Sequence, residues 1–308
     1  MRGLRPSDRE GSSSLSKANV SVACGDVGAG HASPAARPGR GKKAAITETV
    51  RSTDVPALRV RTPVLVSRGD CPIVRQVQAL TFQGWLRWDI VVRLLPSDAS
   101  TVLEIGAGLG SMGAMLAERF SYVGLEPDPT SQTEANVRTG GKVLCERAED
   151  HDGVYDLVCA FEVLEHIDDD VAALAAWRER SRNWLLVSVP MNPDRFGAWD
   201  DLAGHFRRYT AGTLSSALIE GGWKPKAIHA YGFPLGYALN GIQHKVAARQ
   251  TKGDTMIDRT DASGRGPLRP PHAMRYVTWA GALPFRVLQR PFARSKLGTG
   301  LIALATRS

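Results

Sequence analysis

The sequence predicts an α/β protein with a doubly wound, mostly parallel sheet of seven strands and helices on both faces. Two observations predict this fold. From residue 77 to about 231, short apolar runs alternate with amphipathic segments, as in a parallel sheet covered on both faces. The first apolar run, VLEI at 102–105, leads directly into a glycine-rich turn, and the next apolar run ends in an acid.

A helix should come first, because Val77, Trp85, Trp88, Val92 and Leu95 fall mostly three or four residues apart and Pro96 would stop it. The elements that follow are predicted, in order, as strand 101–105, helix 110–119, strand 122–126, helix 130–138, strands 142–145 and 155–160, helix 167–181, strand 184–189, helix 211–220 and strand 225–231. Aspartates at 168–170 suit the first turn of their helix, and Thr210 is a candidate N-cap.

The pattern changes after residue 231. Two apolar helical patches, at about 233–248 and 273–289, flank a stretch rich in Gly, Pro and Arg, and 298–307 is predicted to be the last strand. Residues 232–298 are therefore predicted to be a helical insertion or lid between the last two strands of a domain spanning 59–308. Residues 1–58 have no sustained periodicity and are predicted to be a disordered tail.

The net charge of +8 is unevenly distributed. Residues 61–239 carry a net charge of −6, whereas residues 240–308 carry +9. Such a basic flank could contact nucleic acid, anionic lipid or a phosphorylated substrate, or be a solvated surface. No apolar run approaches the roughly 18 residues of a membrane span, no signal peptide is evident, and the four cysteines form no CxxC pair. The expected location is the cytoplasm, with peripheral membrane contact as an option.

The turn after the first strand predicts a nucleoside-binding crevice. Glu126 ends the second strand, twenty positions after Gly106, where a carboxylate can accept hydrogen bonds from ribose hydroxyls. Ser111 occupies the place of the third glycine of the dinucleotide fingerprint, and Glu104, two residues before Gly106, would repel a pyrophosphate. The loop instead suits a cationic ligand such as S-adenosylmethionine, which has an ammonium, a sulfonium and no phosphate.

At these residues the sequence resembles the class I S-adenosylmethionine-dependent methyltransferases, whose first motif matches Glu104, Gly106, Gly108 and Gly110. Three further segments resemble the branch that includes the ubiquinone-biosynthesis O-methyltransferases: VYDLVCAFEVLEHIDDD at 154–170, LLVSVP at 185–190 and GHFRRYTAGTLSSALIEGGW at 204–223. The resemblance covers about 75–231 and the last strand. It implies a Rossmann-like sheet whose last strand is antiparallel, and S-adenosylmethionine as cofactor.

The resemblance also implies roles for individual residues. Glu104 would reach the cofactor's ammonium, directly or through water, the three glycines would contact the cofactor, and Glu126 would bind its ribose. Ala148 and Glu149 would lie at the adenine edge, although Arg147 stands where relatives carry an acid. Phe161 would pack near the methionine end.

Methyl transfer requires in-line alignment of nucleophile, methyl and sulfur, and a base only when the nucleophile arrives protonated. His205 is the candidate base, because it follows the fifth strand and a histidine is the residue type suited to removing a proton from a hydroxyl near neutral pH; His166 is expected to hold the start of a helix. Arg207 and Arg208 could bind a carboxylate or phosphate, or pair with Asp200 or Asp201. No metal is predicted, because no His/Asp/Glu cluster has ligand spacing in the sequence.

The predicted function is therefore methyl transfer from S-adenosylmethionine to a small-molecule acceptor, at oxygen, with a lipid-like compound or a secondary metabolite as options. The alternatives are an NAD-linked oxidoreductase, a non-catalytic Rossmann-like binding protein and an RNA methyltransferase. DNA is not expected, because no [DNS]PP[YFW] motif follows the fourth strand. Apolar residues beside Arg286 and Arg290 in the insertion suggest peripheral contact with an anionic membrane, or a lid or helical cap. The sequence does not predict the oligomeric state.

Overall fold

The computed structural model describes residues 80–249 and 274–308, all within one compact unit, Pro72–Ser308. The tail predicted at 1–58 and the middle of the predicted insertion, 250–273, lie outside the described residues, and the predicted domain limits stay predictions.

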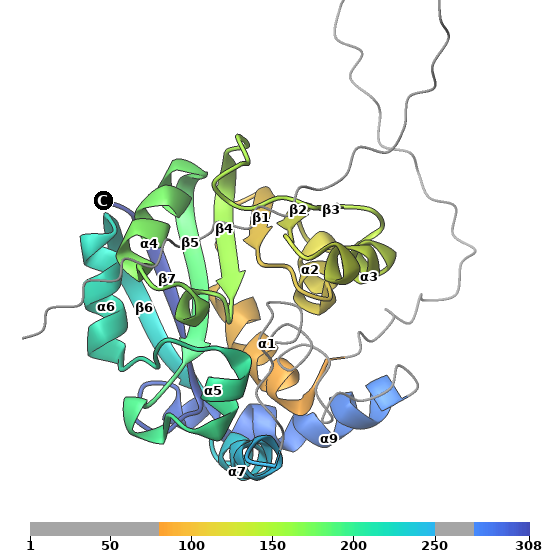
Figure 1. The fold of residues 1–308 in the computed structure, drawn as a ribbon, viewed down its shortest axis with the longest axis vertical. Coiled ribbons are helices and arrows are strands. Elements are labelled where there is room, and N and C mark those ends of the chain that lie inside the picture. Colours follow the sequence, from red (N-terminus) through yellow and green to blue (C-terminus); the bar gives the residue numbers. More distant parts are fainter. Residues whose placement is uncertain (1–79, 250–273) are drawn as a thin grey trace, which may run out of the picture. The chain divides into compact units, whose positions relative to one another are not determined.

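The sheet has seven strands in the order β3-β2-β1-β4-β5-β7-β6 (Figure 1). Their bounds are β1 Thr101–Ile105, β2 Ser121–Leu125, β3 Val143–Leu144, β4 Tyr155–Phe161, β5 Ser181–Pro190, β6 Trp223–Tyr231 and β7 Gly300–Arg307. Strands β1 to β5 pair in parallel, whereas β7 runs antiparallel to both β5 and β6. This topology confirms the predicted fold class.

The helices are α1 Phe82–Leu94, α2 Ser111–Ala117, α3 Pro129–Thr139, α4 Asp170–Glu179, α5 Ala198–Ala203, α6 Ala211–Glu220, α7 Leu235–Ala247 and α9 Arg275–Leu288. Two hydrophobic clusters form the core, one on each face of the sheet. Leu174 and Trp177 of α4 and Leu218 of α6 pack into one cluster. The other cluster takes side chains from α1, α2, α3 and α9.

Local chemistry explains where two helices begin. The Thr81 hydroxyl accepts a hydrogen bond from the Gly84 amide and caps α1. Helix α4 begins at Asp170 rather than at the predicted residue 167, because the Asp169 carboxylate caps it by accepting from Ala172 N and a 3-10 turn, η1 Leu164–His166, precedes it.

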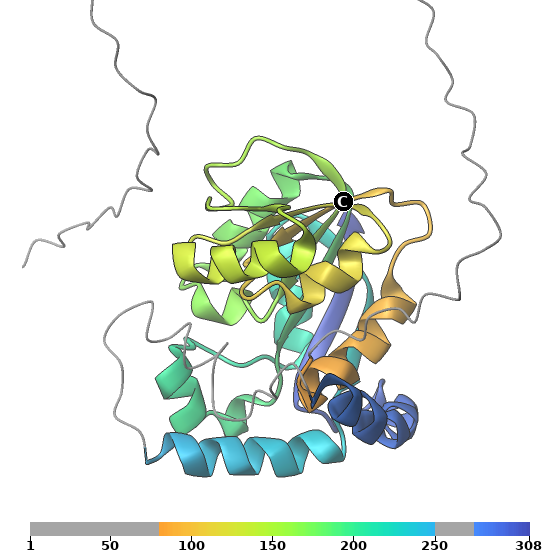
Figure 2. The ribbon, with the colours of Figure 1, turned by 90° about the vertical axis from the view of Figure 1, so that its right-hand side faces the viewer.

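Helices α7 and α9 lie between β6 and β7 in the sequence and make up most of the described part of residues 232–298, whose role as an insertion or lid stays a prediction. Both helices, together with α5, lie beyond the end of the sheet towards which β4 points, and a view turned by 90° agrees (Figure 1, Figure 2). Helix α9 is anchored there by the buried side chain of Gln289, which donates to Leu86 O and accepts from Gly232 N. Among the described residues, no helix is long and apolar enough to cross a membrane.

Candidate active site

The three glycines of the turn between β1 and α2 all have positive φ angles, +67° at Gly106, +54° at Gly108 and +75° at Gly110. A Cβ atom on Gly106 would lie 2.6 Å from Val163 Cγ2, and one on Gly110 would lie 2.7 Å from Ala135 Cα. Packing therefore excludes a side chain at both positions. A Cβ on Gly108 would meet nothing within 4 Å. The space above Gly108 is the part of the turn that a ligand could approach.

This difference predicts two distinct variants. Gly110→Ala should lower the free energy of unfolding by about 2–4 kcal/mol, because it combines the cost of positive φ with a clash against the Ala135 backbone. Gly108→Ala should cost only about 1–2 kcal/mol, because it adds a conformational cost without a clash. Urea unfolding of both proteins measures the difference, and equal losses of stability would contradict the packing argument.

Glu126 follows β2 and is buried against the same turn. One of its carboxylate oxygens accepts from Gly108 N at 2.7 Å, and the other accepts from Asp128 N at 3.0 Å. Burial raises the pKa of Glu126, while these two backbone hydrogen bonds act in the opposite direction. The carboxylate therefore lies beside the open position of the turn, and each of its oxygens keeps a lone pair for a further donor.

Glu104 lies in β1 and is also buried. Its Oε2 accepts a 2.6 Å hydrogen bond from the Tyr122 hydroxyl. Burial raises the pKa of Glu104 to about 8; the Tyr122 hydrogen bond lowers it and nearby Glu126 raises it. Because the folded state favours the protonated carboxyl, Glu104 costs the free protein stability as the pH rises from 4.5 towards about 8.

The other predicted cofactor residues lie around the same end of the sheet. Phe161 ends β4 and is buried in one cluster with Ala107 of the turn. Ala148 is buried with Ile105 and Leu125 in the cluster on the opposite face. The side chain of Glu149 is exposed, unlike those of the other predicted contacts.

Glu162, directly after β4, is a site residue that the sequence analysis did not select. It has a positive φ of 58°, which is uncommon for a residue other than glycine. Its Oε1 accepts from Ser188 Oγ at 2.9 Å and from the Tyr231 hydroxyl at 3.2 Å, and lies 3.3 Å from Arg87. Side chains from α1, β5 and β6 thus converge on the Glu162 carboxylate. In the sequence, the local sign of this site is an acid directly after the fourth strand; its positive φ angle is visible only in the structure.

His205 follows α5 and has a carboxylate partner. Its Nδ1 lies 2.8 Å from Asp200 Oδ1, and Arg208 Nε also donates to that oxygen, at 2.7 Å. Burial acts to raise the pKa of Asp200, but the hydrogen bonds from His205 and Arg208 lower it to about 2. Asp200 is therefore ionised and favours the tautomer in which His205 carries its proton on Nδ1, which leaves Nε2 free to accept one.

Glu165 faces His205 from η1. Its Oε1 lies 4.0 Å from His205 Nε2, too far for a hydrogen bond, and neither carboxylate oxygen has a hydrogen-bond partner among the described residues. Burial raises the pKa of Glu165 well above its usual range, and the charge of Glu162 acts in the same direction. A fully buried carboxyl without a donor is costly, and a bound cation or a substrate hydroxyl would relieve this cost.

His166 completes a cluster with these two residues. One ligand atom each from Glu165, His166 and His205 lie within 4.8 Å of one another, as a divalent cation would require after a small contraction. The prediction of no metal rested on ligand spacing in the sequence, and it stays a prediction beside this cluster, which forms only in the fold. Two adjacent residues meet a third almost forty positions later only through the fold, and their spacing in the sequence does not reveal it.

Comparisons with known proteins bear on what this site does. Residues 77–227 match a family model described as a methyltransferase domain. This segment is a class I S-adenosylmethionine-dependent methyltransferase domain. A search of curated proteins found no match.

Several solved structures are similar to this methyltransferase. They include magnesium protoporphyrin IX methyltransferase from Synechocystis PCC 6803 with bound S-adenosylhomocysteine, at 14% identity over 74% of this chain and 81% of that chain, with a TM-score of 0.42. An S-adenosylmethionine-dependent methyltransferase from Mesorhizobium loti is 14% identical over 73% of this chain and 100% of that chain, with a TM-score of 0.46. The cyclopropane synthase MmaA2 from Mycobacterium tuberculosis is 14% identical over 72% of this chain and 83% of that chain, with a TM-score of 0.46.

The arginines that could have bound a substrate anion are paired inside the methyltransferase. Arg208 is buried on Asp200, and Arg207 Nη1 lies 2.9 Å from Asp170 Oδ1. Both arginines therefore form salt bridges, which was the alternative to binding a substrate anion. The partner of Arg207 is Asp170 rather than Asp201. His166 packs edge-on against His205, with ring centroids 4.7 Å apart.

Proposed function

We propose that this methyltransferase transfers the methyl group of S-adenosylmethionine to an oxygen of a small-molecule acceptor. The observation that carries the proposal is the pairing of an open glycine turn with a cluster able to activate a hydroxyl. Gly108 has free space above it and touches Glu126, while His205 and Glu165 face each other beyond the end of β4. The first group suits a nucleoside, and the second suits a hydroxyl that must lose its proton.

In this proposal Glu126 binds the ribose hydroxyls, and the glycine turn at Gly106, Gly108 and Gly110 contacts the cofactor. Glu104 binds the ammonium. Phe161 packs near the methionine end, and Ala148 and Glu149 read the adenine edge. The burial of Glu104, Glu126, Ala148 and Phe161 at one end of the sheet supports this arrangement. Glu149 has the weakest support, because its side chain is exposed.

At the acceptor, His205 would remove the hydroxyl proton through Nε2, and Asp200 would stabilise the imidazolium that results. Glu165, His166 and His205 could instead hold a divalent cation, which would lower the pKa of a bound hydroxyl. In that case His205 serves as a ligand. A lipid-like acceptor is the form of the proposal that fits the exposed apolar residues of α9, and peripheral membrane contact would deliver such an acceptor.

The role of Glu104 predicts proton release on cofactor binding. With a pKa of about 8, the carboxyl of the free protein is mostly protonated at pH 7. A ligand ammonium beside it would favour the carboxylate, so binding of S-adenosylhomocysteine should release close to one proton. Calorimetry at pH 7 in two buffers of different ionisation enthalpy measures this number. Glu104→Gln is the control and should release almost none. Equal proton release by the wild type and Glu104→Gln would show that the proton comes from a group other than Glu104.

The experiment that tests the function is a screen for methyl acceptance. The protein is incubated with radiolabelled S-adenosylmethionine and fractionated pools of metabolites, lipids and RNA, and His205→Ala serves as the inactive control. Label in a small-molecule fraction, in a product whose NMR spectrum shows a methyl group bonded to oxygen, would support the proposal. Label in RNA would favour the RNA methyltransferase alternative, and cofactor binding without transfer to any pool would favour the non-catalytic one.

A further inference from the structure

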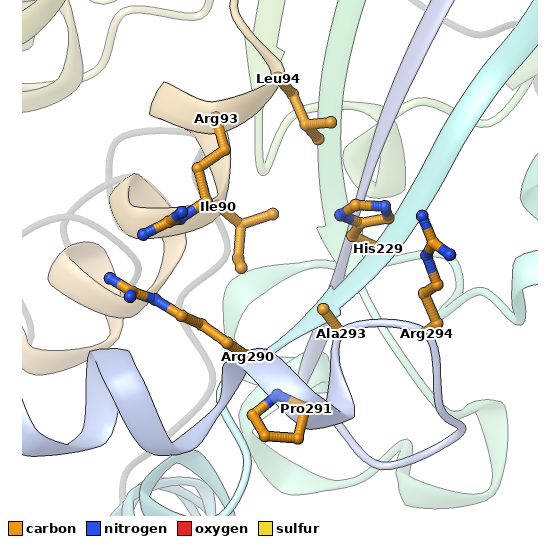
Figure 3. Close-up of a pocket in the computed structure, with 8 residues that line it drawn as sticks. All are labelled: Ile90, Arg93, Leu94, His229, Arg290, Pro291, Ala293 and Arg294. Atoms are coloured by element: carbon orange, nitrogen blue, oxygen red, sulfur yellow. The ribbon is translucent and has the colours of Figure 1, made fainter.

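A pocket of about 280 Å³ lies on a different part of the molecule, between α1, β6 and the residues that follow α9 (Figure 3). The polar side chains that line it are three arginines and a histidine, with no carboxylate: Arg93, Arg290, Arg294 and His229. Ile90, Leu94, Pro291 and Ala293 form the apolar remainder of the wall. The pocket therefore offers guanidinium donors in a partly apolar setting.

The positive charge around this pocket is not balanced. Asp89 is buried behind it and is shared by three arginines: Arg93 at 3.5 Å, Arg286 at 3.6 Å and Arg290 at 3.1 Å. Arg294 has no carboxylate partner among the described residues. Burial and the charge of Arg294 lower the pKa of His229, as expected where the local potential is positive. An anion with several oxygens, such as a phosphate, complements this arrangement.

The outer face of α9, next to this pocket, is apolar. Its side chains there are 38–59% exposed, namely Tyr276, Val277, Leu283, Val287 and Leu288. Arg275 and Arg286 are the charged residues of the helix, and both are half-buried. Residues 274–308 contain six basic residues and no acid. A helix that exposes an uncharged face within a basic segment has the character of an interfacial membrane helix.

We propose that this pocket binds the phosphate of an anionic phospholipid headgroup while the outer face of α9 rests in the adjoining membrane surface. The charge excess selects anionic over zwitterionic lipids, and the apolar face supplies contact with the acyl region. Helix α9 also lies beyond the end of the sheet where the candidate active site is built (Figure 2). A membrane-bound acceptor would then have a short path to that site.

The test is sedimentation of the full chain with vesicles of phosphatidylglycerol and phosphatidylcholine, compared with phosphatidylcholine alone. We expect binding to the anionic vesicles only. Arg294→Glu should weaken binding by about tenfold more than Lys296→Glu, an equal charge change at an exposed position outside the pocket. Arg286 and Arg290 are unsuitable for charge reversal, because both contact buried Asp89.

A second variant tests the apolar face. Val277→Asp/Val287→Asp changes two side chains that are more than half exposed, so the fold and the affinity for S-adenosylhomocysteine should persist while vesicle binding is lost. Three results would overturn the proposal: no sedimentation of the wild type at low salt, equal effects of Arg294→Glu and Lys296→Glu, or calorimetric binding of glycerol phosphate without vesicle binding. The last result would indicate a soluble phosphate ligand. None of these results depends on methyl transfer.

Discussion

Replacing His205 with alanine should lower the turnover number by about 10²–10⁴, the usual contribution of a positioned general base. The variant loses Nε2, the atom that faces Glu165, and it leaves Asp200 ionised with Arg208 as its remaining charged partner. Affinity for S-adenosylhomocysteine should not change, because the glycine turn and Glu126 are untouched. Turnover is measured with a labelled acceptor, and affinity by calorimetry.

His151→Ala is the matched control, because His151 is also partly buried and also lies beside a carboxylate, Glu146, at 3.0 Å. Near-normal turnover of His205→Ala would return His205 to a structural role. Chelation then separates the two catalytic readings. If EDTA leaves activity intact and the protein binds no Mn²⁺, His205 acts as a base. If activity is lost and divalent ions restore it, with Mn²⁺ binding abolished in Glu165→Gln, His205 acts as a ligand.

Replacing Glu126 with alanine should weaken binding of S-adenosylhomocysteine by about tenfold to a hundredfold. Hydrogen bonds to a charged group contribute about 1.5–3 kcal/mol, and the carboxylate is expected to accept from both ribose hydroxyls. The variant also removes the acceptor of the Gly108 and Asp128 amides, so the turn itself loses support.

Glu126→Gln separates these two effects. Its amide oxygen keeps one acceptor for the backbone, but the side chain loses its charge and its second acceptor. Thermal stability above that of Glu126→Ala, together with an affinity as low as that of Glu126→Ala, would assign the loss of affinity to the ribose contact. Equal affinity of the wild type and Glu126→Ala would show that the nucleoside does not bind at this carboxylate.

The cofactor half of the site could be predicted because its residues are close in sequence. Gly106, Gly108 and Gly110 belong to one turn, and Glu126 ends the next strand, so periodicity and glycine spacing bring them together. The same local rules predicted the strands and most of the helices. They missed α5, a helix of six residues between Gly197 and Gly204, which is too short to show a period.

The acceptor half depends on contacts that no spacing reveals. Glu162 meets Arg87 and Tyr231 only after α1 has packed on the sheet and β6 has joined its edge, and Glu165 meets His205 only through the loop after β5. Likewise, Arg286 of α9 and Arg290, which follows that helix, were candidates for membrane contact, but both lie against Asp89. The partners of these buried charged residues are distant in sequence, so only the structure reveals the pairings.

The most direct test of the account is calorimetry of the wild-type protein with S-adenosylhomocysteine and, separately, with NADH. The open space above Gly108, the carboxylate of Glu126 and the buried acid Glu104 before the turn predict binding of S-adenosylhomocysteine at one site and no binding of NADH, which has no ammonium to pair with Glu104. Binding of NADH without binding of S-adenosylhomocysteine would contradict the assignment of the site and of the reaction.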